Sequence, residues 1–268
     1  MPTRDPSETA VEVVGVSHTY RTESGKDVEA LRDVSFFVGQ GEFLGIVGPS
    51  GCGKTTLLNI IAGLVRPTKG RVLVEGKPTQ EELRRRRIGL VFQDPALLAW
   101  RDTEGNVRLP LEVANGGKSG TDKVRDLIKL VGLEGFERNF PKELSGGMRS
   151  RVSIARALST SPAILLMDEP FGSLDEMTAH QLNSELLRVW SSLQPTVVLV
   201  THSISQAVFM SDRIIVLSRR PGCIVQNIVV DLPRPRRDCL LEQSRFVEIE
   251  AAVRHALFPA SQTEGVMP

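Results

Sequence analysis

The stretch Gly48-Pro49-Ser50-Gly51-Cys52-Gly53-Lys54-Thr55 follows the apolar run 43–47 and precedes residues of helical composition. A strand, a glycine-rich loop and a helix in this order are typical of a phosphate-binding loop. The glycines let backbone N–H groups turn toward a triphosphate. Lys54 adds a positive charge, and Thr55 offers a hydroxyl to Mg²⁺ at a helix N-terminus. The pattern predicts a nucleotide-binding α/β domain.

Two later segments narrow this interpretation. Leu144-Ser145-Gly146-Gly147-Met148 comes first, and the apolar run Ile164 to Met167, which ends in Asp168-Glu169, follows it. A carboxylate at the end of a buried strand can hold Mg²⁺ through a water, and the next carboxylate can accept a proton from an attacking water. The alternative, that both acids only cap the following turn, is disfavoured because Pro170 and the other two motifs accompany them.

The three segments, in this order, resemble the ATP-binding cassette (ABC) proteins over about residues 11–240. The resemblance implies a P-loop NTPase (RecA-like) α/β core with a mostly parallel sheet and an N-terminal antiparallel β subdomain. It also implies an inserted α-helical subdomain at about 94–150. Residues 1–10 would be an N-terminal tail, and 241–268 a C-terminal helix and tail.

The same resemblance assigns site residues and cofactors, which are ATP and Mg²⁺. Tyr20 would stack on adenine, Gln93 would contact Mg²⁺ and the attacking water, and His202 would bind the γ-phosphate. Glu169, His202 and Gln93 are the expected catalytic residues, and Thr55, Gln93 and Asp168 the expected metal ligands. The expected ATP-binding residues are Tyr20, Gly48, Pro49, Ser50, Gly51, Cys52, Gly53, Lys54, Thr55, Thr56, Ser145, Gly146, Gly147 and Asp175. His18, His180 and His255 have no such context and are expected to be surface or packing residues.

In the family, the segment 144–148 completes the site of the opposite subunit. There the Ser145 hydroxyl, the Gly147 N–H and a helix N-terminus would grip the γ-phosphate. Asp175 lies in the loop that couples the two sites. The implied unit is a homodimer with two ATP molecules at a head-to-tail interface, closed by ATP and released by hydrolysis.

Further matches resemble the nitrate, sulfonate and taurine importer branch. They include Asp94 to Arg101, Asn106-Val107, Arg220-Pro221-Gly222 and Asp231 to Pro235. In that branch, residues Leu97 to Asn106 receive a helix of an integral membrane permease. An extracytoplasmic solute-binding protein delivers the substrate to this permease. An exposed Trp100 would suit this contact. The alternative is a Trp100 buried in the core of the helical insertion.

Some positions depart from the branch, and they leave partner and substrate open. These positions are Asp102-Thr103-Glu104-Gly105, Ser150, Ser203 and Gln206. Sulfonate, nitrate, taurine, a thiamine precursor and an aromatic acid all remain candidates for the cargo. A soluble ABC ATPase with a regulatory or assembly role is the alternative function. A metabolic kinase is a weaker third, because it would not need residues 144–148.

Composition sets wider bounds. The 268 residues carry a formal net charge of +1, so no overall field favours nucleic acid. The run Arg84 to Arg87 is interpreted as a solvated strand entry, not a nucleic-acid patch. Three separated cysteines indicate a reducing compartment, and Cys52 suggests that thiol alkylation would block ATP binding. No signal peptide or membrane span is apparent, which predicts a soluble subunit. The resemblance to importers implies a peripheral position on the cytoplasmic face of a bacterial inner membrane.

Periodicity predicts the remaining elements. The C-terminal helix would carry Phe246, Ile249, Val253 and Leu257 on one face and pack on its own subunit, the alternative being a docked partner. The extended segment 231–236 would close the core. The predicted strands are 11–16, 31–38, 43–47, 88–92, 164–167, 196–200 and 213–217, and the predicted helices are 55–64, 123–131, 148–158 and 177–193.

Overall fold

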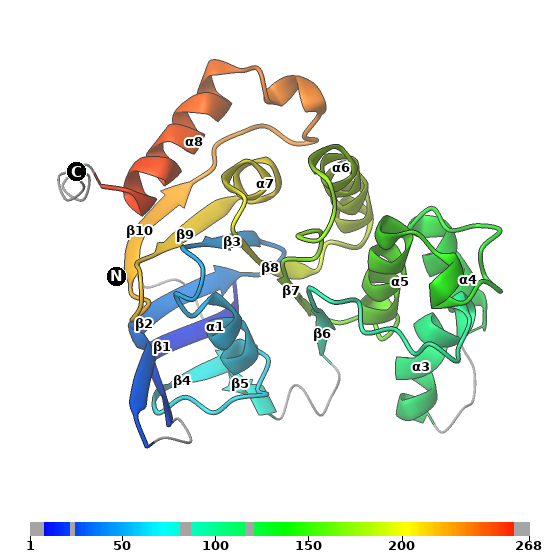
Figure 1. The fold of residues 1–268 in the computed structure, drawn as a ribbon, viewed down its shortest axis with the longest axis horizontal. Coiled ribbons are helices and arrows are strands. Elements are labelled where there is room, and N and C mark those ends of the chain that lie inside the picture. Colours follow the sequence, from blue (N-terminus) through cyan, green and yellow to red (C-terminus); the bar gives the residue numbers. More distant parts are fainter. Residues whose placement is uncertain (1–7, 22–24, 81–86, 116–120, 260–268) are drawn as a thin grey trace.

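The computed structural model describes residues 8–21, 25–80, 87–115 and 121–259. A six-stranded sheet lies at the centre, a four-stranded antiparallel sheet lies against one side of it, and a group of helices extends beyond β6 and β7 (Figure 1). The fold is therefore the predicted α/β class with both a mostly parallel and an antiparallel sheet.

The central sheet has the strand order β10-β9-β3-β8-β7-β6. Five neighbouring strands run parallel, and only β10 pairs antiparallel, with β9. The inner strands are apolar at most positions because both faces are covered. Their bounds are β3 Phe43–Val47, β6 Ile88–Val91, β7 Ile164–Asp168, β8 Thr196–Thr201, β9 Arg213–Leu217 and β10 Ile224–Val229.

The antiparallel sheet has the order β2-β1-β4-β5. Its first strand begins at Thr9, two residues before the predicted strand start at Val11. The predicted N-terminal tail, residues 1–10, therefore ends two residues too late. The second strand begins four residues earlier than the predicted strand at Leu31. The bounds are β1 Thr9–Arg21, β2 Asp27–Gly39, β4 Lys69–Val74 and β5 Lys77–Pro78.

Helices cover both faces of the central sheet. Helix α1 (Lys54–Ile61) lies between the two sheets and buries Leu57 and Ile61 there. Helices α6 (Glu176–Leu193), α7 (Ile204–Met210) and α8 (Ser244–Leu257) cover the other face. Side chains alternate between the two cores along each strand, as Leu165 and Leu166 of β7 show.

The helical group comprises α3 (Thr103–Asn115), α4 (Thr121–Leu130) and α5 (Gly146–Leu158), with a short 3₁₀ turn at Pro141–Glu143. The predicted amphipathic helix corresponds to α4, which buries Val124, Leu127 and Ile128. Helix α3 had no clear pattern in the sequence because it contains Gly105 and Pro110. The limits 94–150 of the proposed insertion enclose α3 and α4, but α5 begins inside them and continues to Leu158.

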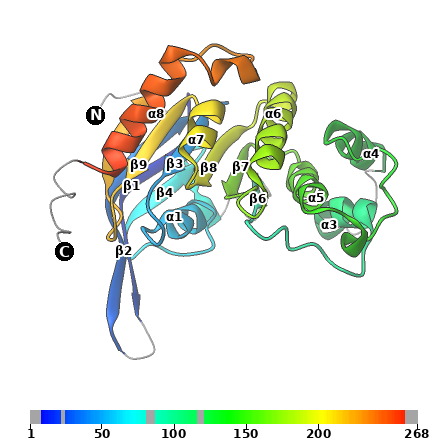
Figure 2. The ribbon, with the colours of Figure 1, turned by 45° about the horizontal axis from the view of Figure 1, so that its top comes forward.

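Helix α8 packs on the core of its own subunit, as predicted. Helix α8 buries Phe246, Ile249 and Val253, and packs next to α7 and the strands β9 and β10 (Figure 2). The preceding extended segment is anchored by two arginines. Arg234 pairs with Asp212, and the buried Arg236 donates to the last carbonyl groups of α7.

Candidate functional site

The glycine-rich loop joins the carboxyl end of β3 to α1. Gly51 and Gly53 have φ angles of 72° and 105°, in the left-handed region that favours glycine. A Cβ on Gly53 would lie 2.7 Å from the Ala30 carbonyl oxygen and 2.8 Å from a methyl group of Leu31. The loop can therefore lie against β2 only with glycine at position 53.

Lys54 reaches back into this loop. Its Nζ donates to the carbonyl oxygens of Gly48 at 2.8 Å and Pro49 at 3.2 Å, and the side chain is nearly buried. Helix α1 begins at Lys54 without a side-chain cap, and its first turn has no acidic residue. A helix N-terminus of this kind favours an anion.

The prediction that alkylation of the Cys52 thiol blocks ATP binding does not agree with the position of this side chain. The side chain is 1% exposed, and a Cβ on Gly48 would lie 2.7 Å from the Cys52 sulfur, so the thiol packs beneath the loop instead of lining it. Burial raises the pKa of the Cys52 thiol. Alkylating reagents react with accessible thiolates. The predicted alkylation of Cys52 is therefore not expected in the folded protein.

Two neighbouring parallel strands end beside the loop. Asp168 is the last residue of β7, Glu169 follows it, and His202 follows β8. A Glu169 carboxylate oxygen lies 2.8 Å from His202 Nδ1. Burial raises the pKa of Asp168, and a hydrogen bond from Thr55 partly offsets this effect. The strand order thus joins residues of three separate motifs.

Tyr20 lies near the end of β1, next to helix α1. Its hydroxyl lies 3.2 Å from the Thr56 hydroxyl, and its ring remains partly exposed. The ring of His18 contacts the Tyr20 ring edge-on at 4.4 Å between centroids, which makes His18 a packing residue as predicted. Gln93 lies exposed just beyond β6. An aromatic face next to a phosphate-binding loop is suited to a nucleobase.

The segment 144–148 lies elsewhere on the chain. Ser145 is the N-cap of α5, where its hydroxyl accepts from Met148 N–H at 3.3 Å. Asp175 caps α6 in the same way, and hydrogen bonds from Thr178 lower the pKa of Asp175. A Cβ on Gly146 would lie 2.8 Å from Leu174, so the two helix starts are in contact. In both ribbon views α5 lies across β6 and β7 from α1 (Figures 1 and 2).

Sequence reasoning missed how the segment after Gln93 is held. The buried Asn106 binds four backbone groups, which are Leu98 N–H and the carbonyl oxygens of Leu98, Arg101 and Asp102. Arg156 of α5 donates to the carbonyl oxygens of residues 95 and 96. Trp100 is left 74% exposed on this segment, which excludes the alternative that it belongs to the core of the insertion.

These features define a nucleotide-binding domain of the phosphate-loop class. The family model described as ABC transporter matches residues 31–172. Three relatives and one solved structure illustrate the similarity.

An uncharacterised ABC transporter ATP-binding protein of Methanocaldococcus jannaschii is 46% identical over 87% of this chain and 86% of its own length. The nitrate import ATP-binding protein NrtD of Synechococcus elongatus is 38% identical over 91% of this chain and 89% of its own. The aliphatic sulfonates import ATP-binding protein SsuB of Bacillus cereus is 40% identical over 84% and 88%. A dimeric post-hydrolysis structure of the cassette MJ0796 with ADP and Pi has a TM-score of 0.73 and 34% identity, over 83% of this chain and 100% of that one.

The chain therefore belongs to the ABC transporter family of ATP-binding subunits, and it is an ATPase of the cassette type. In the part of the chain that the structure describes, no helix is long and apolar enough for a membrane span.

Proposed function

We propose that this chain is the ATP-hydrolysing subunit of an importer, and that two copies close head to tail on two ATP molecules. The observation that carries the proposal is the separation of the phosphate loop from the Ser145 helix start within one chain. Each can bind phosphate, but they begin different helices on opposite sides of β6 and β7. A second copy would bring the two together, and the dimeric state of the similar cassette MJ0796 supports such an arrangement.

In each site, the loop 48–53, Lys54, Thr55 and Thr56 hold the phosphates, and Tyr20 stacks on the adenine. The partner supplies Ser145, Gly146 and Gly147, while Asp175 links the two sites. The exposed Ser145 at the start of α5, whose first turn has no acidic residue, supports this role. The contact between Gly146 and Leu174 gives Asp175 a direct mechanical connection to that turn.

Thr55, Gln93 and Asp168 would hold Mg²⁺ together with the ATP phosphates. The described residues contain no cluster of three His, Cys, Asp or Glu side chains that would hold a metal alone. Mg²⁺ in nucleotide sites needs only one or two carboxylates, because the phosphates supply the other ligands. The buried carboxylate of Asp168 fits such a cation, which would neutralise the developing charge on the phosphates.

Glu169 is the proposed general base, since it lies next to Asp168 with its carboxylate held by His202. If His202 Nδ1–H donates to Glu169, Nε2 is left to face the γ-phosphate. A ring that donates at both positions carries two N–H groups and a positive charge. His202 would then orient the base and stabilise the phosphate in one arrangement.

The exposed Trp100 supports docking of a membrane permease along residues 97–106. Asn106 fixes the backbone of this segment, so the indole is presented on a rigid support. The similarity to nitrate and sulfonate import proteins favours a small anionic or organic nutrient as cargo. The subunit would be peripheral, on the cytoplasmic face of the inner membrane, and supplied by an extracytoplasmic solute-binding protein.

Isolation of the Glu169→Gln variant from its native cells, with MgATP and mild detergent, tests this proposal. Mass spectrometry should identify a multi-span membrane protein in stoichiometric amount. Trp100→Ala in the same background should reduce that recovery, whereas Val225→Ala, on the exposed face of β10, should not. A trapped homodimer with only soluble partners would instead favour the regulatory or assembly cassette.

A further inference from the structure

A cavity of about 640 Å³ lies at the sheet edge opposite the ATP site. Its lining includes Gly41, Arg87 and Ala163, which immediately or closely precede β3, β6 and β7. The phosphate loop and Asp168 lie at the other ends of these strands. Strands of four to six residues separate the two regions by about 15–20 Å. We call this space the N-edge cavity, and it is independent of the nucleotide site.

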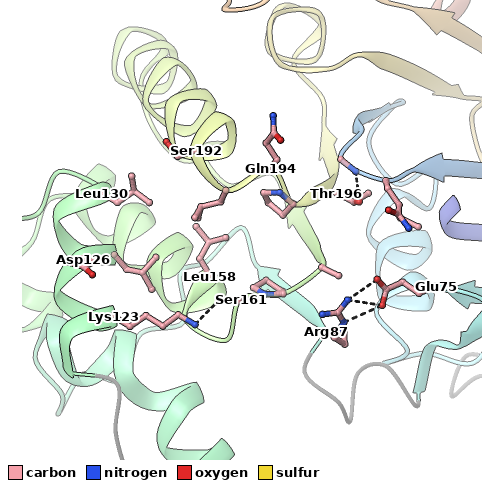
Figure 3. A pocket seen from close by; sticks show the side chains of 18 residues that line it. Glu75, Arg87, Lys123, Asp126, Leu130, Leu158, Ser161, Ser192, Gln194 and Thr196 are labelled. Atoms are coloured by element: carbon pink, nitrogen blue, oxygen red, sulfur yellow. Dashed lines mark hydrogen bonds and ion pairs between the residues drawn. The ribbon is translucent and has the colours of Figure 1, made fainter. Parts of the chain in front are cut away.

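The N-edge cavity has two walls (Figure 3). Helix α4 forms one wall with Leu127 and Leu130, and the other wall includes Leu158 at the end of α5 and Leu193 at the end of α6. Leu130 and Leu193 are 36% and 49% exposed, so this apolar surface is open to a ligand. The lining combines this apolar surface with polar and charged side chains, and a cavity of this volume is large enough for a small molecule.

Lys123 supplies the charge of the N-edge cavity. Its Nζ donates to the Ser161 hydroxyl at 2.8 Å across the gap between α4 and the core, and no ion pair to Lys123 is present among the described residues. Burial lowers the pKa of Lys123, which shows that the ammonium group is partly removed from water. A neutral hydroxyl does not compensate this charge, but an anionic ligand would.

The neighbouring charges limit what that ligand can be. Arg87 makes two-nitrogen hydrogen bonds to Glu75, so the pair adds no net charge to the cavity. Asp126, one turn from Lys123 on α4, is exposed and adds a negative charge to the lining. One acid group on the ligand is balanced by Lys123, whereas a second would face Glu75 and Asp126. This arrangement disfavours nucleotides and other polyanions.

We propose that the N-edge cavity binds a small organic monoanion, a carboxylate or sulfonate with an apolar body. The acid group pairs with Lys123, and the hydrocarbon part lies against Leu130, Leu158 and Leu193. Because α4 and Leu158 belong to the helical group and Leu193 belongs to α6 of the core, the bound ligand connects these two parts of the subunit.

Calorimetric titration of the full chain with hexane-1-sulfonate tests the proposal. The wild type should bind it with and without saturating MgADP. Lys123→Gln should weaken binding by roughly tenfold or more, because a charge-assisted contact is lost, and Lys123→Arg should retain most of it. Lys129→Gln is the matched control, since Lys129 lies on the same helix with its side chain 71% exposed. Circular dichroism checks that each variant is folded.

The apolar half is tested with shorter probes and a neutral one. Affinity should fall by up to roughly fourfold for each methylene removed between hexane- and ethanesulfonate. Leu130→Gln should flatten this dependence, and 1-hexanol should bind Lys123→Gln as well as the wild type. Displacement of hexanesulfonate by MgADP, equal binding by Lys123→Gln, or no binding to the wild type at millimolar concentration would each overturn the proposal.

Discussion

At the scale of single residues, the proposed general base catalysis depends on the contact between Glu169 and His202. Glu169→Gln keeps the shape of the side chain but removes its basicity. Turnover should fall by about 10²–10⁴-fold, the range of general base catalysis, while ATP binding persists. ATPase assays and binding of a fluorescent ATP analogue measure the two effects separately. Glu176→Gln, exposed in the first turn of α6, is the control. Normal turnover in Glu169→Gln would show that another group is the base.

Asp168 combines a proposed functional role with a cost in stability. Burial raises the pKa of Asp168 in the folded protein, so ionisation of the carboxylate opposes folding. This penalty is fully present above the folded pKa and disappears as the pH falls below the unfolded value. Asp168→Asn should therefore raise the free energy of unfolding of the nucleotide-free protein at neutral pH, with little gain at acidic pH, and should lose Mg²⁺-dependent turnover. Urea unfolding at several pH values measures this, and a pH-independent gain would contradict it.

At the scale of elements, Asn106 determines how α3 begins. Its buried amide makes four hydrogen bonds to the backbone of the segment 98–102, which leads into the helix. Asn106→Ala should reduce the free energy of unfolding by about 2–4 kcal/mol, because several buried backbone groups lose their partner. Chemical denaturation is the measurement, and Asn227→Ala on the exposed face of β10 is the control. Equal stability of both variants would show that water replaces the amide.

The elements also show what sequence patterns can predict. The strands β3, β7, β8 and β9 are mostly apolar runs, because both of their faces are buried, and their predicted bounds were correct to within about one residue. Strands β4 and β10 were not predicted, since most of their residues are exposed or half-buried. Helix α3 was not predicted because Gly105 and Pro110 are poor helix formers. The hydrogen bonds of Asn106 that hold the start of the helix are not visible in the sequence.

The candidate site shows the same division. Local spacing predicted the phosphate loop, because that loop is built within one strand, turn and helix. The contact between Glu169 and His202 depends on β7 and β8 being neighbours, and spacing alone does not determine strand order. The accessibility of Cys52 depends on how the loop packs on β2 and was predicted wrongly. The roles of individual site residues remain predictions for the experiments above.

At the scale of the whole molecule, the separated half-sites predict a dimer that depends on ATP. Glu169→Gln should sediment as a dimer in MgATP and as a monomer in MgADP, because only ATP bridges both halves. Adding Ser145→Arg should abolish the dimer by placing a bulky side chain at the start of α5. Trp100→Ala should leave it intact, since the indole belongs to the proposed permease contact. Analytical ultracentrifugation distinguishes these outcomes, and a nucleotide-independent dimer would contradict the proposal.

Tyr20 is the only tyrosine in the chain, and its hydroxyl meets Thr56 next to the phosphate loop. Growth on 3-fluorotyrosine would therefore place a single fluorine label in the whole protein, at the proposed adenine contact. One ¹⁹F resonance would then report nucleotide occupancy throughout the hydrolytic cycle, without any engineered substitution. When the labelled chain is combined with unlabelled permease subunits, the same resonance could be followed in the proposed transporter.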